Sequence, residues 1–456
     1  MFKSYVLFFF LSIAFAISAQ AQITIRSITI TGNNKTKSYI IQRELPYHIG
    51  SVVPADSLEA YNTLGQHQIF NTSLFNEAKV ESIMVDSTTA DVLIHVKERW
   101  YLFPLPYFRW VDRNFSQWWN QQNRSLDRVN YGMNFRQSNF TGNNDRLVIG
   151  LITGYTHQAI LRYQIPFIDK KLQWGVGAGL QYYTQKEMNF TTLADKQIFY
   201  KSDRDLKEGI RANANLTYRP NLFERFNFQV GLGEEQISAE AFTKAPTLLP
   251  TLSKSMRYAD FTFGYTKTKF DYNAYPTKGA SSEFAWYQRL AKNAPFSSLQ
   301  FRKVFVHPFN KTNFIYTESN SQIKFLSNQN YTDQKLLGYG SLQMSGLEYY
   351  VVDGNAATIG KFAFHHKIGT ITLRNPVTKK FLQEVKYHFW LKLFTHLGYV
   401  YSEKPLNASK LSNTLLRTAG IGVDIISIYD FVLKVDYSVN QLGDKGLYLH
   451  LSLIHI

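Results

Sequence analysis

The stretch GIRANANLTYRP, residues 209–220, alternates apolar and hydrophilic residues along most of its length. Successive side chains of a β-strand point to opposite faces, so this pattern predicts a long strand with one apolar and one hydrophilic face. The stretch LKVDYSVN, residues 433–440, repeats the pattern. A soluble sandwich satisfies it, and so does a membrane barrel with lipid outside and a wet lumen inside.

The composition favours the membrane barrel. Phe, Trp and Tyr make up 16% of the chain, whereas Asp, Glu, Lys and Arg make up only 18%. A typical soluble domain has about 25% charged residues. Beyond the first residues, no segment has the uncharged apolar length of a spanning helix. Many aromatic residues, few charges and alternating strands together predict a mostly β protein built around a transmembrane β-barrel.

The chain begins MFKSYVLFFFLSIAFAISAQAQ, which joins a basic Lys3 to an apolar run over residues 5–17. The small residues Ala19 and Ala21 follow. This order predicts a secretory signal peptide, residues 1–21, because the run is shorter than the roughly 20 residues that cross a membrane. The chain contains no cysteine, which excludes disulfides, thiolate metal sites and a lipid anchor on cysteine.

The formal net charge of +16 suits an exported barrel in two ways. Basic side chains could line the lumen or contact the anionic headgroups of membrane lipids. Nucleic acid is not an expected partner, since the sequence has no dense cluster of Lys and Arg.

Strands of the alternating kind fill the chain from residue 101 to residue 456. An even number of strands returns both ends of a single-chain barrel to one side. The long connections, which we expect to face outside the cell, are at 188–204, 239–254, 327–360 and 403–414. The sixteen predicted strands span approximately 101–111, 124–140, 145–155, 157–167, 172–187, 205–221, 224–238, 255–271, 279–291, 296–309, 311–326, 361–374, 385–402, 415–427, 431–441 and 446–455.

Residues 22–100 have a different pattern, with the predicted order β-α-α-β-β. The segments TGNNKT, QREL and VLIHVKER occur in this order, and as a set they resemble a POTRA domain. The resemblance implies a small α+β module in the periplasm that binds polypeptides. It also implies that the strand near Lys79–Val85 offers a free edge to an incoming strand.

A sixteen-stranded barrel behind a POTRA domain resembles the BamA/TamA superfamily of outer-membrane insertases and translocases. In that family the loop between the eleventh and twelfth strands folds into the barrel and carries a Val-Arg-Gly-Tyr/Phe tip. The matching stretch here is LQMSGLEYYVVDG, residues 342–354, within the loop 327–360. The tip positions are Ser345, Gly346, Leu347 and Glu348, and Gly346 would allow a sharp turn.

This sequence departs from the family at both ends of an ion pair. The family's tip arginine is Ser345 here, and its partner aspartate on the thirteenth strand is His396, within FTHLG. The parity of His396 with Lys392 would place it in the lumen. A lone buried charge is costly, so the loss of both partners together is physically coherent. We therefore expect Ser345 to lie close to His396, and the loop to be held mainly by Leu347, Tyr349 and Tyr350.

Two further stretches resemble the same family. FDYNAYPTKGA, residues 270–280, looks like the family's turn between the eighth and ninth strands, with Asp271, Pro276 and Gly279 at the matching positions. The C-terminal GLYLHLSLIHI, residues 446–456, resembles a terminal barrel strand, although it ends in isoleucine and not in the usual phenylalanine.

Other patterns do not support enzyme chemistry. Glycines 175, 177 and 179 lie within a strand with no helix after it, so a phosphate-binding loop is not expected. His365 and His366 are neighbours on a strand and point to opposite faces, so they cannot share one metal ion. No convincing Ser/His/carboxylate set is present, and we predict neither enzyme activity, nor a cofactor, nor a metal.

The sequence thus predicts an outer-membrane barrel with its N-terminal domain in the periplasm. By resemblance, it would assist the insertion or translocation of outer-membrane polypeptides. Expected partners are membrane lipids, unfolded outer-membrane polypeptides, and periplasmic or lipoprotein assembly factors. Two alternatives stay open, because the missing ion pair also suits an accessory or structural subunit of an assembly machine, and a barrel alone suits a plain channel.

Overall fold

A computed structural model describes residues 21–111, 118–120, 123–326, 330–374, 384–405 and 408–453. The predicted signal peptide, except for its last residue, lies outside the described residues. The chain divides into two compact units. The first contains residues up to 34 and residues 38–98, and the second contains residues 35–37 and everything from Arg99 onward.

The first unit is a four-stranded sheet with two α-helices. The predicted β-α-α-β-β order is confirmed, with one additional short strand, β2. The sheet order is β2-β1-β4-β3, so β3 lies at an edge, and Ile25, Ile69 and Phe75 are fully buried in the core. The elements are β1 (Gln22–Thr31), α2 (Ser38–Gln42), β2 (Val52–Pro54), η1 (Ala55–Ser57), α3 (Leu58–Asn71), β3 (Phe75–Met84) and β4 (Thr89–Glu98).

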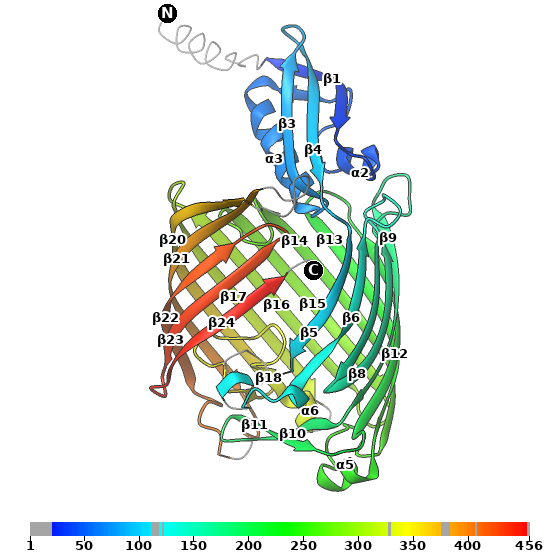
Figure 1. The fold of residues 1–456 in the computed structure, drawn as a ribbon, viewed down its shortest axis with the longest axis vertical. Coiled ribbons are helices and arrows are strands. Elements are labelled where there is room, and N and C mark those ends of the chain that lie inside the picture. Colours follow the sequence, from blue (N-terminus) through cyan, green and yellow to red (C-terminus); the bar gives the residue numbers. More distant parts are fainter. Residues whose placement is uncertain are drawn as a thin grey trace, which may run out of the picture. The chain divides into compact units, whose positions relative to one another are not determined.

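The second unit is a sixteen-stranded antiparallel sheet that curves into a barrel (Figure 1). Its strand order follows the chain, so that each strand pairs with its sequence neighbours. The sixteen predicted strands are confirmed, with small shifts at their ends. They are β5 (Leu102–Trp110), β6 (Val129–Ser138), β7 (Arg146–Gly154), β8 (Thr156–Ile165), β9 (Trp174–Gln185), β12 (Lys207–Tyr218), β13 (Glu224–Ile237), β14 (Ser255–Phe270), β15 (Gly279–Ala291), β16 (Phe296–Pro308), β17 (Asn313–Leu326), β20 (Ala356–Arg374), β21 (Glu384–Tyr401), β22 (Leu415–Ile426), β23 (Phe431–Asn440) and β24 (Lys445–Leu453).

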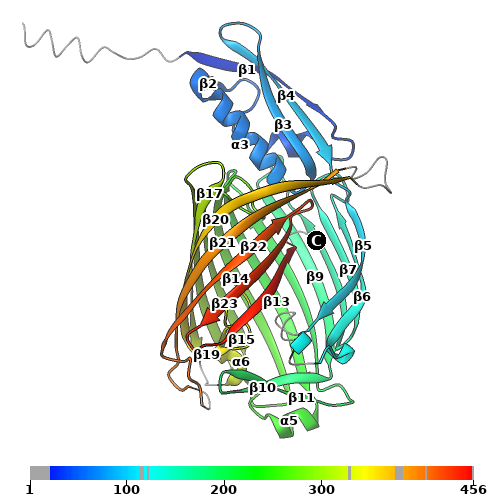
Figure 2. The ribbon, with the colours of Figure 1, turned by 60° about the vertical axis from the view of Figure 1, so that its left-hand side comes forward.

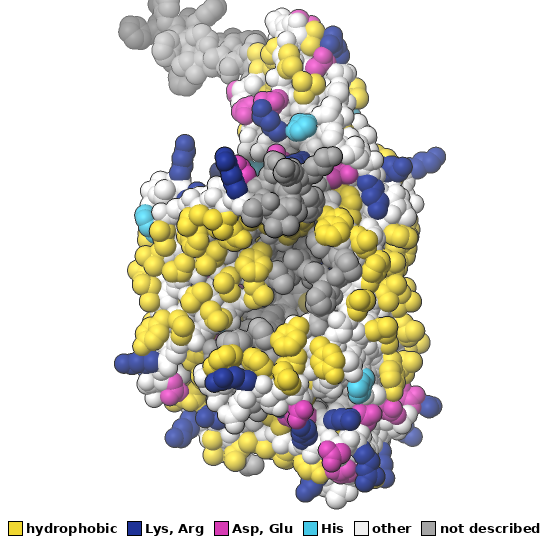
Figure 3. All heavy atoms as spheres, in the orientation of Figure 1, with side chains coloured by type: hydrophobic (Ala, Val, Ile, Leu, Met, Phe, Trp, Pro, Cys, Tyr) yellow, Lys and Arg dark blue, Asp and Glu magenta, His cyan; other side chains and the backbone are white. Residues whose placement is uncertain are grey.

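The two faces of the barrel wall differ as the alternation predicts. On β21, Leu393 and Leu397 are 52% and 51% exposed, whereas Lys392 and His396 are only 7% exposed. Apolar side chains cover much of the visible outer wall, and most charged side chains lie towards its ends (Figure 3). The outer face is therefore suited to lipid, and the inner face carries the polar groups.

The long connections at one end of the barrel contain secondary structure of their own. The predicted long connection over 188–204 lies between β9 and β12, and most of it forms a two-stranded hairpin that was not predicted. None of the helices among the described residues is long and apolar enough to span a bilayer. The additional elements are η2 (Leu126–Arg128), β10 (Glu187–Leu193), β11 (Lys196–Lys201), α5 (Ala239–Lys244), α6 (Tyr331–Gln334), β18 (Lys335–Leu337) and β19 (Val352–Asp353).

Candidate functional site

The tip of the loop between β17 and β20 lies against the inner wall of the barrel. The backbone N–H of Ser345 donates to Nδ1 of His396 at 3.2 Å. The carbonyl of Gly346 accepts a hydrogen bond from Asn440 on β23 at 2.8 Å. Gly346 has a φ of +94°, and a Cβ there would lie 3.2 Å from Thr418, so both the backbone and the space favour glycine.

Glu348 and Tyr349 extend the tip towards the last strand. Oε2 of Glu348 accepts from the N–H of Gly346 at 2.7 Å, which closes the turn. Oε1 of Glu348 lies 3.2 Å from Nε2 of His450 on β24. The rings of Tyr349 and Tyr448, also on β24, are 5.7 Å apart. The loop tip therefore contacts the strand that ends the sheet.

Apolar packing holds the body of the loop. Leu347 is only 2% exposed and belongs to a buried cluster with residues of β20, β21 and β22. Tyr350 packs against this cluster and donates its hydroxyl to Asp444 at 2.6 Å. The members of the cluster are Leu336, Leu337, Leu342, Met344, Leu347, Val352, Ala357, Ile359, Val400, Leu411 and Leu416.

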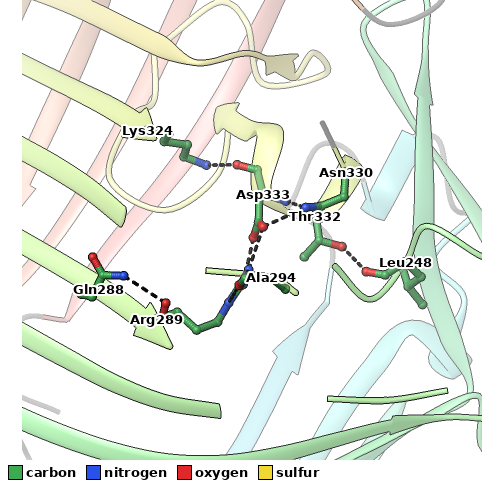
Figure 4. Close-up of polar contacts among 8 residues, drawn as sticks. All are labelled: Leu248, Gln288, Arg289, Ala294, Lys324, Asn330, Thr332 and Asp333. Atoms are coloured by element: carbon green, nitrogen blue, oxygen red, sulfur yellow. Dashed lines mark hydrogen bonds and ion pairs between the residues drawn. The ribbon is translucent and has the colours of Figure 1, made fainter. Parts of the chain in front are cut away.

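A buried ion pair fixes the base of the same loop to the wall (Figure 4). Arg289 on β15 donates from Nη1 and Nη2 to the two carboxylate oxygens of Asp333 on α6, at 2.9 and 2.8 Å. The side chains of both residues are less than 10% exposed. Asn330 caps α6 by accepting from the N–H of Asp333 at 2.9 Å. Such a two-point, charge-assisted contact fixes both position and orientation.

Two further residues, Lys324 and Thr332, make contacts beside this pair (Figure 4). Nζ of Lys324 on β17 donates to the carbonyl of Asp333 at 2.9 Å, and it also contacts the carbonyl of Lys335. The hydroxyl of Thr332 donates to the carbonyl of Leu248, in the connection between β13 and β14. The base of the loop is thus tied to two wall strands and to a neighbouring connection.

The Arg289–Asp333 pair changes the expectation that apolar contacts mainly hold the loop. That expectation is incomplete, because it included Ser345 and His396 as the only polar contact of the loop. In the family that residues 342–354 resemble, the arginine is on the loop and the acid is on the wall. Here the acid is on the loop, the arginine is on the wall, and the pair lies at the base of the loop.

A second set of opposite charges lies within the loop itself. Lys335 on β18 and Asp353 on β19 face each other in the short ladder. Burial lowers the pKa of Lys335 to about 8 and raises the pKa of Asp353 to about 6. Both groups are therefore charged near neutral pH, and each partly offsets the cost of burying the other.

The hairpin β10–β11 reaches across the end of the barrel at which α6 lies (Figure 2). Asp195 at its tip is 3% exposed. Its carboxylate accepts from the N–H groups of Lys410 and Leu411, at 2.7 and 3.2 Å, and from the hydroxyl of Ser409. Its carbonyl accepts from the N–H of Val351 at 2.8 Å. One aspartate therefore joins the hairpin, the connection after β21 and the inserted loop.

We expect Asp195→Ala to loosen this cap. The substitution leaves buried N–H groups without their acceptor, and hydrogen bonds to charged groups contribute about 1.5–3 kcal/mol each. Purified protein in a planar bilayer should then show a higher and more variable conductance than the unaltered protein. Asp127→Ala is the matched control, since Asp127 pairs with Lys201 of the same hairpin while 71% of its side chain is exposed. Equal conductance of both variants would contradict a role for Asp195.

The turn between β14 and β15, at the other end of the barrel, is held by its own acid. Asp271 accepts hydrogen bonds from the N–H groups of Thr277 and Lys278, at 3.0 and 3.1 Å, so that the turn closes around Pro276. Gly279 has a φ of +119°, and a Cβ there would lie 1.9 Å from the carbonyl oxygen of Lys269. Asp271 therefore bonds the backbone of this turn, and glycine suits the conformation at position 279.

The two ends of the sixteen-stranded sheet are β5 and β24. They face each other on one side of the barrel (Figure 1). Every other neighbouring pair in the sheet forms a ladder, but among the described residues β5 and β24 share none. We call this boundary the seam.

Known proteins resemble this chain in its first unit and in its overall fold. Residues 23–99 match the POTRA family model, described as "Surface antigen variable number repeat". BamA from Haemophilus ducreyi lacking POTRA domains 1–3 is 15% identical, with a TM-score of 0.51 over 94% of this chain and 84% of that one. CdiB from Escherichia coli is 11% identical, with a TM-score of 0.56 over 94% and 75%. CdiB from Acinetobacter baumannii is 12% identical, with a TM-score of 0.51 over 94% and 73%.

These findings define a class of protein: a POTRA domain followed by a barrel with the fold of BamA and CdiB. A search of curated protein sequences gives no match. The fold resemblance expected from residues 342–354 and 270–280 is therefore confirmed, whereas the roles of the individual tip, partner and turn residues stay predictions.

Proposed function

We propose that this protein assists the insertion or translocation of polypeptides at the outer membrane, with its POTRA domain in the periplasm. The observation that carries the proposal is the seam, because two end strands that share no ladder among the described residues each present a sheet edge to an incoming strand. A POTRA domain with its own free edge, β3, precedes this sheet. Both features would let an extended segment add to a sheet edge through main-chain hydrogen bonds.

In the proposed mechanism, a client segment first pairs with an edge of the POTRA sheet and then with β5 or β24 at the seam. Main-chain hydrogen bonds supply the affinity, so the activity needs neither a nucleotide nor a cofactor. The inserted loop supports the seam from inside, since Glu348 and Tyr349 contact residues of β24. Membrane lipids, unfolded outer-membrane polypeptides and periplasmic or lipoprotein assembly factors are the proposed partners.

A plain channel is a weaker alternative. The hairpin β10–β11, tied down by Asp195, lies at one end of the barrel. The inserted loop packs against the inner wall through a buried cluster. A barrel filled and capped in this way is poorly suited to free diffusion.

An accessory or structural subunit is the stronger alternative, and the tip of the loop favours it. Where the related family has an arginine and an aspartate, this chain has Ser345 and His396. Their contact is one backbone hydrogen bond, which contributes about 0.5–1.5 kcal/mol. If the family's ion pair is essential for insertion, this chain would support a machine without performing the insertion itself.

Photo-crosslinking along β3 tests whether the POTRA domain binds client polypeptides. Ile83 and Met84 are 54% and 47% exposed near the end of this edge strand. We expect photoreactive residues at these two positions to capture unfolded outer-membrane proteins, because the edge can pair with them. A photoreactive residue at Glu59, which is exposed on α3, is the matched control and should capture few or none.

Depletion of the protein completes the test. A general loss of outer-membrane barrels would support insertion, whereas a loss confined to one assembly would support the accessory subunit. Capture of no client at Ile83 and Met84, together with an unchanged outer-membrane proteome, would contradict both.

A further inference from the structure

Three residues from distant parts of the chain meet at one end of the seam. Arg99 precedes β5 and is the first residue of the barrel unit after residues 35–37. Its Nη1 and Nη2 donate to the two carboxylate oxygens of Asp430, at 2.8 and 3.2 Å. Asp430 lies in the turn between β22 and β23, and both side chains are buried. The hydroxyl of Tyr272, from the turn between β14 and β15, donates to Asp430 at 2.6 Å.

The location of this pair relative to the seam follows from the strand register. Phe431, directly after Asp430, pairs with Leu453 at the C-terminal end of β24. Leu102, at the start of β5, is three residues after Arg99. In an antiparallel barrel the start of β5 and the end of β24 lie at the same end. The pair therefore joins β5 to the turn before β23, and it does so without using β24.

The turn that contains Asp430 has an unusual backbone conformation. Tyr429 and Asp430 have φ values of +57° and +62°, a region that aspartate tolerates but that is unfavourable for a bulky residue such as tyrosine. The guanidinium of Arg99 lies over the ring of Tyr429, 5.7 Å from its centroid. Asn-Gly would form such a turn with less strain. Tyr429 and Asp430 stand there instead, and both contact Arg99.

We propose that Arg99 and Asp430, supported by Tyr272 and Tyr429, form a clamp that holds one end of the seam closed. The inference rests on the proposed function in one respect, since it assumes that the seam parts to admit a strand. The clamp must open before β5 and β24 can separate at this end. Because the described residues of β5 and β24 share no ladder, this ion pair governs where the seam can start to part.

Spin labels test the clamp directly, and the absence of native cysteine makes the labelling specific. Trp100→Cys, just before β5, with Leu451→Cys on β24 places labels on exposed positions near the clamp. Phe108→Cys with Leu447→Cys places them on exposed positions towards the other ends of β5 and β24. In the purified full chain, we expect Arg99→Met to broaden the clamp-end distance distribution and add a longer population. The far-end distribution should change less.

Two further variants make the result decisive. Asp430→Asn removes the charge while keeping a residue that suits a positive φ, so it should fold and broaden the clamp-end distribution as well. Arg374→Met is the control, because Arg374 pairs with Glu384 in an exposed contact of 3.5 Å, and it should leave both distributions unchanged.

An unchanged clamp-end distribution in folded Arg99→Met and Asp430→Asn overturns the proposal. Failure of both variants to fold, while Arg374→Met folds, overturns it too, because the pair would then be a folding requirement and not a clamp. The measurement needs no client polypeptide. A broadened distribution, together with no client capture from β3 and an unchanged outer-membrane proteome on depletion, would therefore contradict the proposed function and leave the clamp standing.

Discussion

Arg289→Ala is expected to release the base of the inserted loop and to lower the free energy of unfolding by about 3–5 kcal/mol, the usual cost of breaking a buried ion pair from one side. The substitution leaves the carboxylate of Asp333 buried without its guanidinium partner. Urea unfolding of the purified barrel measures the free energy. Trypsin provides a local readout, since Lys335 follows α6 directly and should be cleaved faster once the loop is released.

Two controls isolate the ion pair from a general loss of contacts. Arg374→Ala removes a pair whose side chains are 87% and 50% exposed, and such pairs contribute at most about 1 kcal/mol. The double variant Arg289→Ala, Asp333→Ala leaves neither charge buried alone, so it should be more stable than the sum of the single losses predicts. Equal losses for Arg289→Ala and Arg374→Ala would show that the pair does not hold the loop.

Ser345→Arg alone is expected to destabilise the loop tip, by about 2–3 kcal/mol for a poorly satisfied buried charge. The new guanidinium would lie next to His396, which pairs across strands with Lys361, so the surroundings are already basic. Adding His396→Asp supplies the missing partner and should recover most of the loss. The shift from compact to unfolded mobility on heating, followed on a gel, measures the stability of each variant.

His396→Asp alone provides the control for this pair. Its carboxylate would lie near Lys361, so it should be tolerated better than Ser345→Arg alone. If the double variant is no more stable than Ser345→Arg, residues 345 and 396 do not form the partner positions that the family resemblance implies.

The alternation in residues 209–220 and its repeats were sufficient to predict the strands. A side chain on a barrel wall has only two faces to choose between, and lipid on one face makes that choice visible in the sequence. The contact between Ser345 and His396 could be anticipated only through the family resemblance, because no local pattern joins positions 51 residues apart.

The Arg289–Asp333 pair and the hairpin β10–β11 were missed for different reasons. Arg289 alternates with Leu290, which is 50% exposed on the outer face, so a lumen-facing arginine was a signal that some acid must meet it. The hairpin turns at Ala194 and Asp195, with φ values of +48° and +60°. Without the usual Asn-Gly there, short-range turn chemistry gave no sign of a hairpin.

The sequence separations of two contacts imply an order in which the barrel is completed. Arg289 and Asp333 are 44 residues apart, whereas Asp195 and Leu411 are 216 apart. Contacts that close long loops carry the larger entropic cost and tend to form later. We therefore expect the base of the loop to dock while the last strands are still being added. The Asp195 contact, by comparison, can form only once the chain beyond β21 has arrived, so a closed cap would report a nearly finished barrel.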